Sequence, residues 1–223
     1  MKITQLFQEH GVHTKAEKGS HIFQEGERAE SIFLIQSGTI QISKETESGK
    51  ELTIRICSNE GLIGESLLFC KLNYHATTAK ALEASELLVV HNDALELLLT
   101  EHPSLMMDYL KWIQTENMKN QSRLRDLVLH GKKGALFSTL IRLANTYGEF
   151  RSENEIYINY ALTNTEMANL CATSREMINR MLNDLKKHGV ITIGKGYITI
   201  LDLQFLKDEI DCENCPLSIC RID

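Results

Sequence analysis

Apolar residues in the first hundred positions recur in short runs separated by turns. The runs SHIFQ, SIFLI, TIQIS and ELTIRI are divided by glycines at regular intervals. Runs of this length with regular turn signals predict an antiparallel sandwich or barrel. The stretch 61–64, GLIG, is interpreted as a tight turn, and residues 76–91 as two more strands. The pattern therefore predicts a β-domain between a short N-terminal helix and a helical stretch that starts at residue 94.

A single long helix is expected from Ser104 to Leu129, because Pro103 suits a first helical turn and no Gly or Pro follows within it. Its apolar and amide positions step by four and three over three heptads, as in a coiled-coil seam. The seam consists of Met106, Leu110, Ile113, Asn117, Asn120, Leu124 and Leu127. This spacing predicts a homodimer. The alternative is a helix that packs on its own domain through Tyr109 and Trp112.

The last third of the chain has the pattern of a winged helix-turn-helix. Residues 163–166, TNTE, form a capping box that opens a short helix ending at Leu170. A turn at 171–173 leads to a second helix from Ser174 to His188, and Gly189 closes it. The strands VITI and YITI then flank a Gly-Lys-Gly turn. Between the long helix and this motif, Gly131 is interpreted as a helix end and FRSENE as a polar loop.

The second helix of this motif carries side chains suited to reading DNA. One polar face holds Arg175, Glu176, Asn179 and Arg180. Arginine pairs with guanine and glutamate accepts from cytosine in the major groove. The stretch 173–189 has four basic and two acidic residues, hence +2, although the net charge of −6 argues against non-specific nucleic-acid binding. The alternative is a solvated face with Glu176 as a capping carboxylate.

Composition limits the remaining chemistry. With 43% hydrophobic residues, no apolar run of signal-peptide length and no stretch of membrane-spanning length, the chain is expected to be globular and cytoplasmic. Clustered thiols in a reducing compartment indicate a metal more than a disulfide. Cys57, Cys70 and Cys171 are interpreted as buried thiols. No nucleophile–base arrangement or phosphate-binding loop stands out, so no enzyme is expected.

Three cysteines close the chain as C-x2-C-x4-C, namely Cys212, Cys215 and Cys220. Zinc would take them together with an acidic residue, and an iron–sulfur cluster would use the same thiolates. A disulfide between Cys212 and Cys215 is a further alternative. The spacing alone does not choose between zinc and iron–sulfur.

The stretch KGSHIFQEGERAESIFLIQSGTIQIS resembles a cyclic-nucleotide-binding jelly roll, and GLIGES resembles its phosphate-binding turn. With the long helix, the whole chain resembles the family of the cyclic-AMP receptor protein and the FNR regulators. The resemblance implies an α+β fold in four parts. These are a β jelly roll at 1–102, a dimerisation helix at 103–131, a winged helix-turn-helix at 132–210 and a cysteine tail at 211–223.

One departure from the family argues against cyclic AMP as a ligand. Members that bind the nucleotide carry an arginine after the Gly-Glu turn, where it grips the cyclic phosphate. This chain reads NYHATT at 73–78 and has His75 at that place, with no arginine between Arg55 and Arg123. Glu65 is then a structural remnant of the turn.

The resemblance also assigns the DNA site and the metal. Ser174-Arg175-Glu176 followed by Arg180 is similar to the recognition helix of the cyclic-AMP receptor protein, which implies palindromes of TGTGA-like half-sites. The tail is similar to that of the Bacillus-type FNR regulators, which hold a [4Fe–4S] cluster with three such cysteines and an aspartate at the end of the dimer helix. Asp126, in RLRDLVLHGKKGAL, corresponds to that aspartate.

Taken as a whole, the resemblance implies a cytoplasmic, homodimeric transcription regulator that senses oxygen and acts with RNA polymerase on double-stranded DNA. The alternative is a zinc-stabilised or small-molecule-responsive regulator without an iron–sulfur switch. Neither interpretation places the protein in a membrane.

Overall fold

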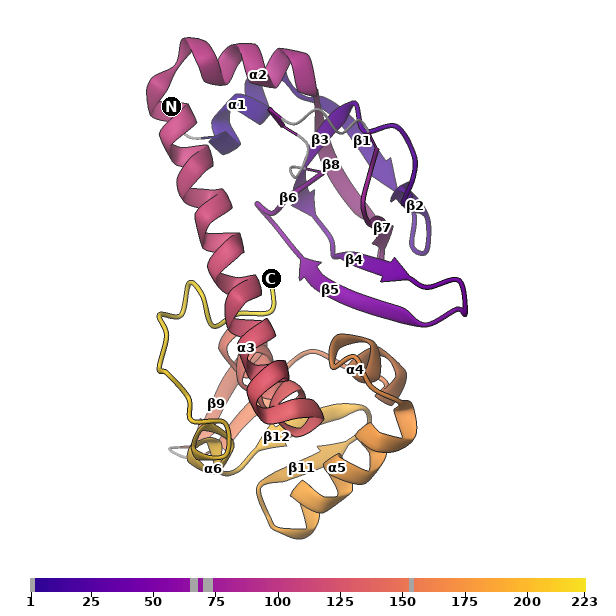
Figure 1. Ribbon diagram of the computed structural model, residues 1–223, viewed down its shortest axis with the longest axis vertical. Coiled ribbons are helices and arrows are strands. Elements are labelled where there is room, and N and C mark those ends of the chain that lie inside the picture. The colour runs from indigo at the N-terminus through magenta and orange to yellow at the C-terminus, as the bar shows by residue number, and fades with distance from the viewer. Residues whose placement is uncertain (1–2, 65–67, 70–73, 153–154) are drawn as a thin grey trace. The chain divides into compact units, whose positions relative to one another are not determined.

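The computed structural model describes residues 3–64, 68–69, 74–152 and 155–223. The chain forms two compact units, residues 1–114 and 115–222, and the boundary falls inside the long helix α3 (Pro103–Tyr147). Figure 1 labels most of the elements of both units. Among the described residues, none of the helices combines the length and hydropathy that a bilayer crossing requires.

The first unit is a β-sandwich of two antiparallel sheets with four strands each. One sheet has the order β1 (Val12–Ala16), β8 (Ser85–His91), β3 (Ser31–Ser37) and β6 (Leu62–Ile63). The other has the order β2 (His21–Phe23), β7 (Thr78–Ala81), β4 (Ile40–Glu45) and β5 (Glu51–Cys57). Alternate residues of the strands, such as Ile40 and Ile42, are buried in the core of the sandwich.

Helices complete the first unit. The elements α1 (Ile3–His10), α2 (Asn92–Glu101) and the start of α3 share a core with β3 and β8. Leu6, Leu95, Leu99 and Leu105 are fully buried there against Leu88. Each helix therefore buries one apolar stripe, as expected of helices at the surface of a small domain.

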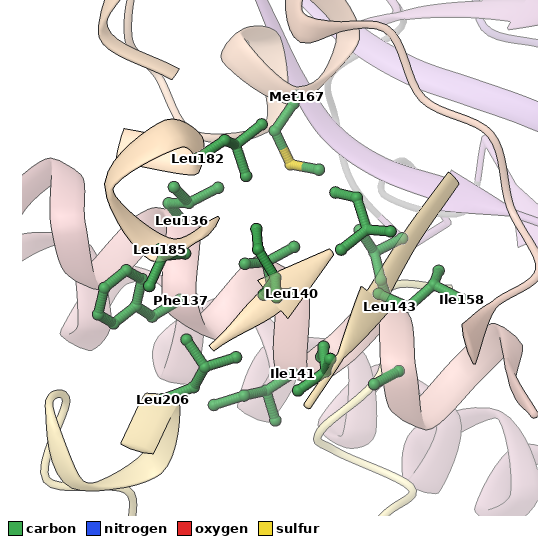
Figure 2. Packing of buried hydrophobic residues seen from close by; sticks show 14 of the residues in the cluster. Leu136, Phe137, Leu140, Ile141, Leu143, Ile158, Met167, Leu182, Leu185 and Leu206 are labelled. Carbon is green, nitrogen blue, oxygen red and sulfur yellow. The ribbon is translucent and has the colours of Figure 1, made fainter. Parts of the chain in front are cut away.

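The second unit packs helices on a four-stranded antiparallel sheet of order β11-β12-β10-β9. Its strands are β9 (Gly148–Ser152), β10 (Glu155–Ile158), β11 (Ile191–Gly194) and β12 (Tyr197–Ile200), and its helices besides α3 are α4 (Asn164–Leu170), α5 (Arg175–Lys187) and α6 (Leu203–Asp208). Figure 2 shows Leu136, Leu140 and Leu143 of α3 within this core, together with Met167 of α4 and Leu182 of α5.

Helix α3 is broken at one residue. Gly131 has φ 61° and ψ −150°, which interrupts the helical geometry. A side chain at this position would meet no atom within 4 Å, so the backbone angle alone favours glycine. The break divides α3 into a first segment, residues 103–130, and a second segment, residues 132–147. The helix end predicted at Gly131 is confirmed, although the second segment resumes at once.

The fold class predicted from the sequence is confirmed, and three local expectations were wrong. Leu62–Ile63 is the short strand β6 where a turn was expected, and residues 148–152 form β9 where a polar loop was expected. Strand β1 was not predicted. Both β1 and β9 are edge strands with mostly exposed side chains, so they carry no alternating apolar signal.

The predicted coiled-coil seam is correct at only some of its positions. Met106 and Ile113 pack against the core of the first unit, and Leu127 packs against the core of the second. Leu110 and Leu124 are 50% and 61% exposed. The apolar side chains that α3 leaves exposed before Gly131 are Met107, Leu110, Met118, Leu124, Val128 and Leu129. One set of apolar side chains of α3 therefore packs on its own chain, and a second set is exposed.

Candidate functional site

The helix-turn-helix is built by local hydrogen bonds, of which the sequence predicted the capping box at Thr163. The Thr163 hydroxyl accepts from the Glu166 backbone N–H at 3.2 Å, and the Glu166 carboxylate accepts from the Thr163 N–H at 2.7 Å. The capping box is thus confirmed. Ala172 makes the turn with φ 49°, and Ser174 caps α5 by accepting from the Met177 N–H at 3.2 Å. Gly189 ends the motif with φ 71°.

The four predicted readout residues, Arg175, Glu176, Asn179 and Arg180, are all exposed on α5. The opposite face buries Ile178, Leu182 and Leu185 in the core of the second unit. Arg180 donates only to the Met177 sulfur, at 2.9 Å, among the contacts described, so its guanidinium is available to a ligand. The backbone N–H of Glu176 and the Ser174 hydroxyl lower the pKa of Glu176, which keeps this carboxylate ionised. The role of the four residues in DNA binding stays a prediction.

The strands that follow α5 form the wing. They pair antiparallel, with Ile191 opposite Ile200 and Gly194 opposite Tyr197. Lys195 and Gly196 connect them, with φ 51° and 84°. Two positive φ values in a two-residue loop are typical of the tight turns that match strand twist. The wing therefore presents the exposed Lys195 at its tip.

The cysteine tail follows α6 and is tied to both segments of α3. Arg125 of the first segment donates to the carbonyls of Ile210 (3.2 Å) and Asp211 (2.9 Å). Asn145 of the second segment donates to the Cys220 carbonyl at 2.8 Å. Figure 1 shows the tail in yellow beside α3. The tail thus bridges the break at Gly131 within the second unit.

All three tail cysteines and Asp126 line one cavity of about 20 Å³, which we call the tail cavity; Arg125 and Arg142 also line it. A volume of this size holds roughly one water molecule. Cys220 is buried, and Cys212 and Cys215 are half-buried. All three are free thiols, so the disulfide alternative is not formed.

Asp126 is held by two arginines. Its side chain is 5% exposed; Oδ2 accepts from Arg142 Nη2 at 2.8 Å and Oδ1 from Arg125 Nη1 at 3.0 Å. From the residues alone, Asp126 is equally consistent with an exposed helix charge paired with a nearby arginine; the structure contains the pairing, but the side chain is buried. Sequence analysis missed Arg142, because only the break at Gly131 brings residues of the two segments together.

The thiols surround the cavity without converging on one point. Burial raises the pKa of the Cys220 thiol to about 11; Arg142 lowers this pKa, and Cys215 and Cys212 raise it further. Among the residues that the structure describes, no three His, Cys, Asp or Glu side chains lie close enough together to hold one metal ion. Metal binding here therefore requires these side chains to move towards a common centre and to lose protons.

His75, at the position that the resemblance assigns to a phosphate-binding arginine, lies in the first unit. His75 is 6% exposed, and its ring stacks on Phe23 at 3.8 Å between centroids. Burial lowers the pKa of His75, while Glu27 raises it, so the imidazole is neutral near pH 7.

Cys57 and Cys171 are buried as predicted, and burial raises the pKa of Cys171 to about 12. The predictions for Glu65 and Cys70 lie outside the described residues.

A β-sandwich, a long helix and a winged helix-turn-helix together define a class of DNA-binding transcription regulators. The family model "Cyclic nucleotide-binding domain" matches residues 13–102, and "Crp-like helix-turn-helix domain" matches residues 135–209. The chain is 50% identical to the "Anaerobic regulatory protein" of Bacillus subtilis (strain 168), over 94% of this chain and 88% of that one. This chain belongs to the CRP/FNR family of transcription regulators.

More distant relatives are similar in sequence or in structure. The chain is 25% identical to the "CRP-like cAMP-activated global transcriptional regulator" of Mycobacterium tuberculosis (strain ATCC 25618 / H37Rv), over 85% of this chain and 84% of that one. The structure resembles the c-di-GMP responsive global regulator CLP of Xanthomonas campestris, with a TM-score of 0.77, 18% identity and coverage of 89% and 97%.

Proposed function

We propose that this chain is a homodimeric regulator of anaerobic genes that responds to oxygen through a [4Fe–4S] cluster held by Cys212, Cys215, Cys220 and Asp126. The observation that carries the proposal is that three thiols and a buried carboxylate line one cavity, although Asp126 lies far from the cysteines in the sequence. The half-identical relative is named an anaerobic regulatory protein. A regulator of promoters works where the chromosome is, so we place it in the cytoplasm.

The donor set suits this cofactor. Thiolates are the usual ligands of iron–sulfur clusters, and a carboxylate is a harder and weaker ligand for such iron. When bound, the cluster supplies oxygen-labile iron–sulfur chemistry. Arg142 and Arg125 offset part of the negative charge that four deprotonated ligands bring to the cavity.

The positions of the ligands connect metal binding to DNA binding. Asp126 belongs to the first segment of α3, and the cysteines follow the winged motif. Ligation by both restrains the break at Gly131 and thereby the orientation of α5. Without it, the hydrogen bonds of the tail and the contacts of Arg142 with Asp126 and Ser122 are left to restrain the break. The proposed switch is therefore the rigidity of the Gly131 break.

The DNA target follows from α5 and from symmetry. A dimer presents two recognition helices, so it fits a palindrome with half-sites about one helical turn apart. The exposed apolar side chains of α3 are available to a second copy of the chain. We assign TGTGA-like half-sites to Arg175, Glu176, Asn179 and Arg180, with RNA polymerase as the further partner.

Purification without oxygen tests the proposal. We expect a brown protein that contains iron and sulfide and binds a TGTGA palindrome, and that loses both colour and specific binding in air. Asp126→Cys should keep a cluster that decays more slowly, because a thiolate replaces the weaker ligand. A colourless protein with about one zinc per chain, whose DNA binding is unchanged in air, contradicts the proposal and favours the zinc-stabilised alternative.

A further inference from the structure

We propose that Arg142 is a positioning residue of the tail cavity. One of its nitrogens holds Asp126, and its remaining N–H groups donate hydrogen bonds to the sulfur ligands of the bound cluster. The inference rests on the proposed function and goes beyond the four ligands. It concerns a side chain that no spacing in the sequence marks.

The observation is an incompletely satisfied buried arginine. The Arg142 side chain is 3% exposed. Its Nη2 donates to Asp126 Oδ2 at 2.8 Å and to the Ser122 hydroxyl at 3.0 Å. Its Nε and Nη1 are buried and have no hydrogen-bond partner among the residues that the structure describes. Leaving charged donors unsatisfied away from water is costly, so this arrangement indicates a partner that arrives with a ligand.

The surroundings of Arg142 identify that partner as anionic. The residue lines the tail cavity with Cys212, Cys215 and Cys220. Metal-bound cysteines are thiolates, and a thiolate or sulfide accepts hydrogen bonds from a cationic donor. Hydrogen bonds to the sulfurs are one of the means by which proteins set the properties of a cluster.

Arg125 provides the internal comparison. It also bonds Asp126, but its side chain is 23% exposed. Its other donors are engaged by the carbonyls of Ile210 and Asp211 and by the Glu213 carboxylate. Of these two arginines, therefore, Arg142 is the one with donors left for a ligand. Arg125 binds the backbone of the tail, and Arg142 has donors for a ligand in the tail cavity.

The experiment compares Arg142→Gln and Arg142→Lys with Arg125→Gln as the matched control, since the control also removes an ion pair with Asp126. Each full-length variant is reconstituted with iron and sulfide without oxygen. Iron per chain, the rate of bleaching in air and the midpoint reduction potential are measured. Urea unfolding of the cluster-free proteins checks that each variant folds.

We expect Arg142→Gln to weaken cluster retention on the order of 10- to 100-fold, as is typical of residues that orient metal ligands. Its midpoint potential should be more negative than that of the wild type, because a positive charge no longer stabilises the reduced cluster. Arg142→Lys keeps the charge without the planar fork, so the potential should stay near that of the wild type while retention falls. Arg125→Gln should change both quantities less.

The outcomes separate the two proposals. If wild-type protein loads a cluster and both Arg142 variants match it in retention and potential, the inference about Arg142 is overturned and the proposed function stands. If wild-type protein loads no cluster, both are overturned. If Arg142→Gln does not fold, unchanged retention in Arg142→Lys overturns the inference by itself.

Discussion

The β-sandwich and the tail cavity each contain a buried ionisable side chain, His75 and Arg142, and the two lie in different surroundings. In the sandwich, His75 stacks on Phe23, and its backbone pairs with Gly26 and Glu27. In the tail cavity, Arg142 is buried beside three free thiols, and two of its nitrogens lack hydrogen-bond partners within the described part of the chain. Buried charged groups without partners are costly, so a ligand is to be sought at the tail cavity first.

The largest effect is expected from a tail cysteine. Cys215→Ala should abolish cluster binding and reduce specific DNA affinity to the non-specific level, a loss of about 10³-fold or more. The matched control is Cys57→Ala, which removes a buried thiol of the sandwich and should keep iron and DNA binding. Iron analysis and gel-shift titration without oxygen measure both. Loss of iron in Cys57→Ala, or retention of iron in Cys215→Ala, would contradict the assignment of the cluster to the tail cavity.

The next effect concerns stability. Asp126→Ala leaves Arg142 buried without its carboxylate, which should cost about 3–5 kcal/mol in the free energy of unfolding of the cluster-free protein. In the double variant Asp126→Ala/Arg142→Met, the buried charge is also gone, and part of the loss should be recovered. Urea unfolding measures all three proteins. A double variant no more stable than Asp126→Ala would mean that the ion pair does not account for the loss.

The tail cavity also illustrates what the sequence can predict. Elements with strong local signals were found, such as the capping box at Thr163 and the recognition helix that it precedes. The identity of Asp126 as a ligand candidate came from a resemblance, because no local pattern distinguishes it from a surface charge. Arg142 was missed because its meeting with Asp126 depends on a single backbone angle at Gly131. The prediction of a coiled-coil seam on α3 was partly wrong, because some residues of the apolar repeat pack on their own chain and others are exposed.

A smaller effect is expected at the DNA surface. Arg180→Ala should weaken binding to a TGTGA-like palindrome by about 1–3 kcal/mol per half-site, because a bidentate contact to guanine is lost. The control is Arg151→Ala, which removes another exposed arginine of the second unit, one that lies over Tyr157. Gel shifts on specific and scrambled DNA measure the change. Equal loss on both sequences would show that Arg180 contacts only phosphate.

The sandwich should respond weakly to pH through His75. Burial lowers its pKa from the ordinary value of 6.5, so the folded state binds fewer protons than the unfolded state once the pH falls below that value. The stability from neutral His75 is therefore present above pH 6.5 and is lost as the pH falls through the lower folded pKa. His75→Gln should lack this component. A difference in unfolding free energy between the two proteins that stays constant from pH 8 to 5 would contradict it.

The smallest effect, none at all, is expected from cyclic AMP. A cyclic phosphate needs a fixed cationic fork, and a neutral imidazole stacked on Phe23 supplies neither the charge nor a bidentate donor pair. The relative from Mycobacterium tuberculosis, named as cAMP-activated, is a suitable positive control. Titration calorimetry should give no binding heat for this chain, and its DNA affinity should not change with added nucleotide. Saturable binding at about micromolar concentration, near −8 kcal/mol, would restore the sandwich as a sensor and remove the contrast with the tail cavity.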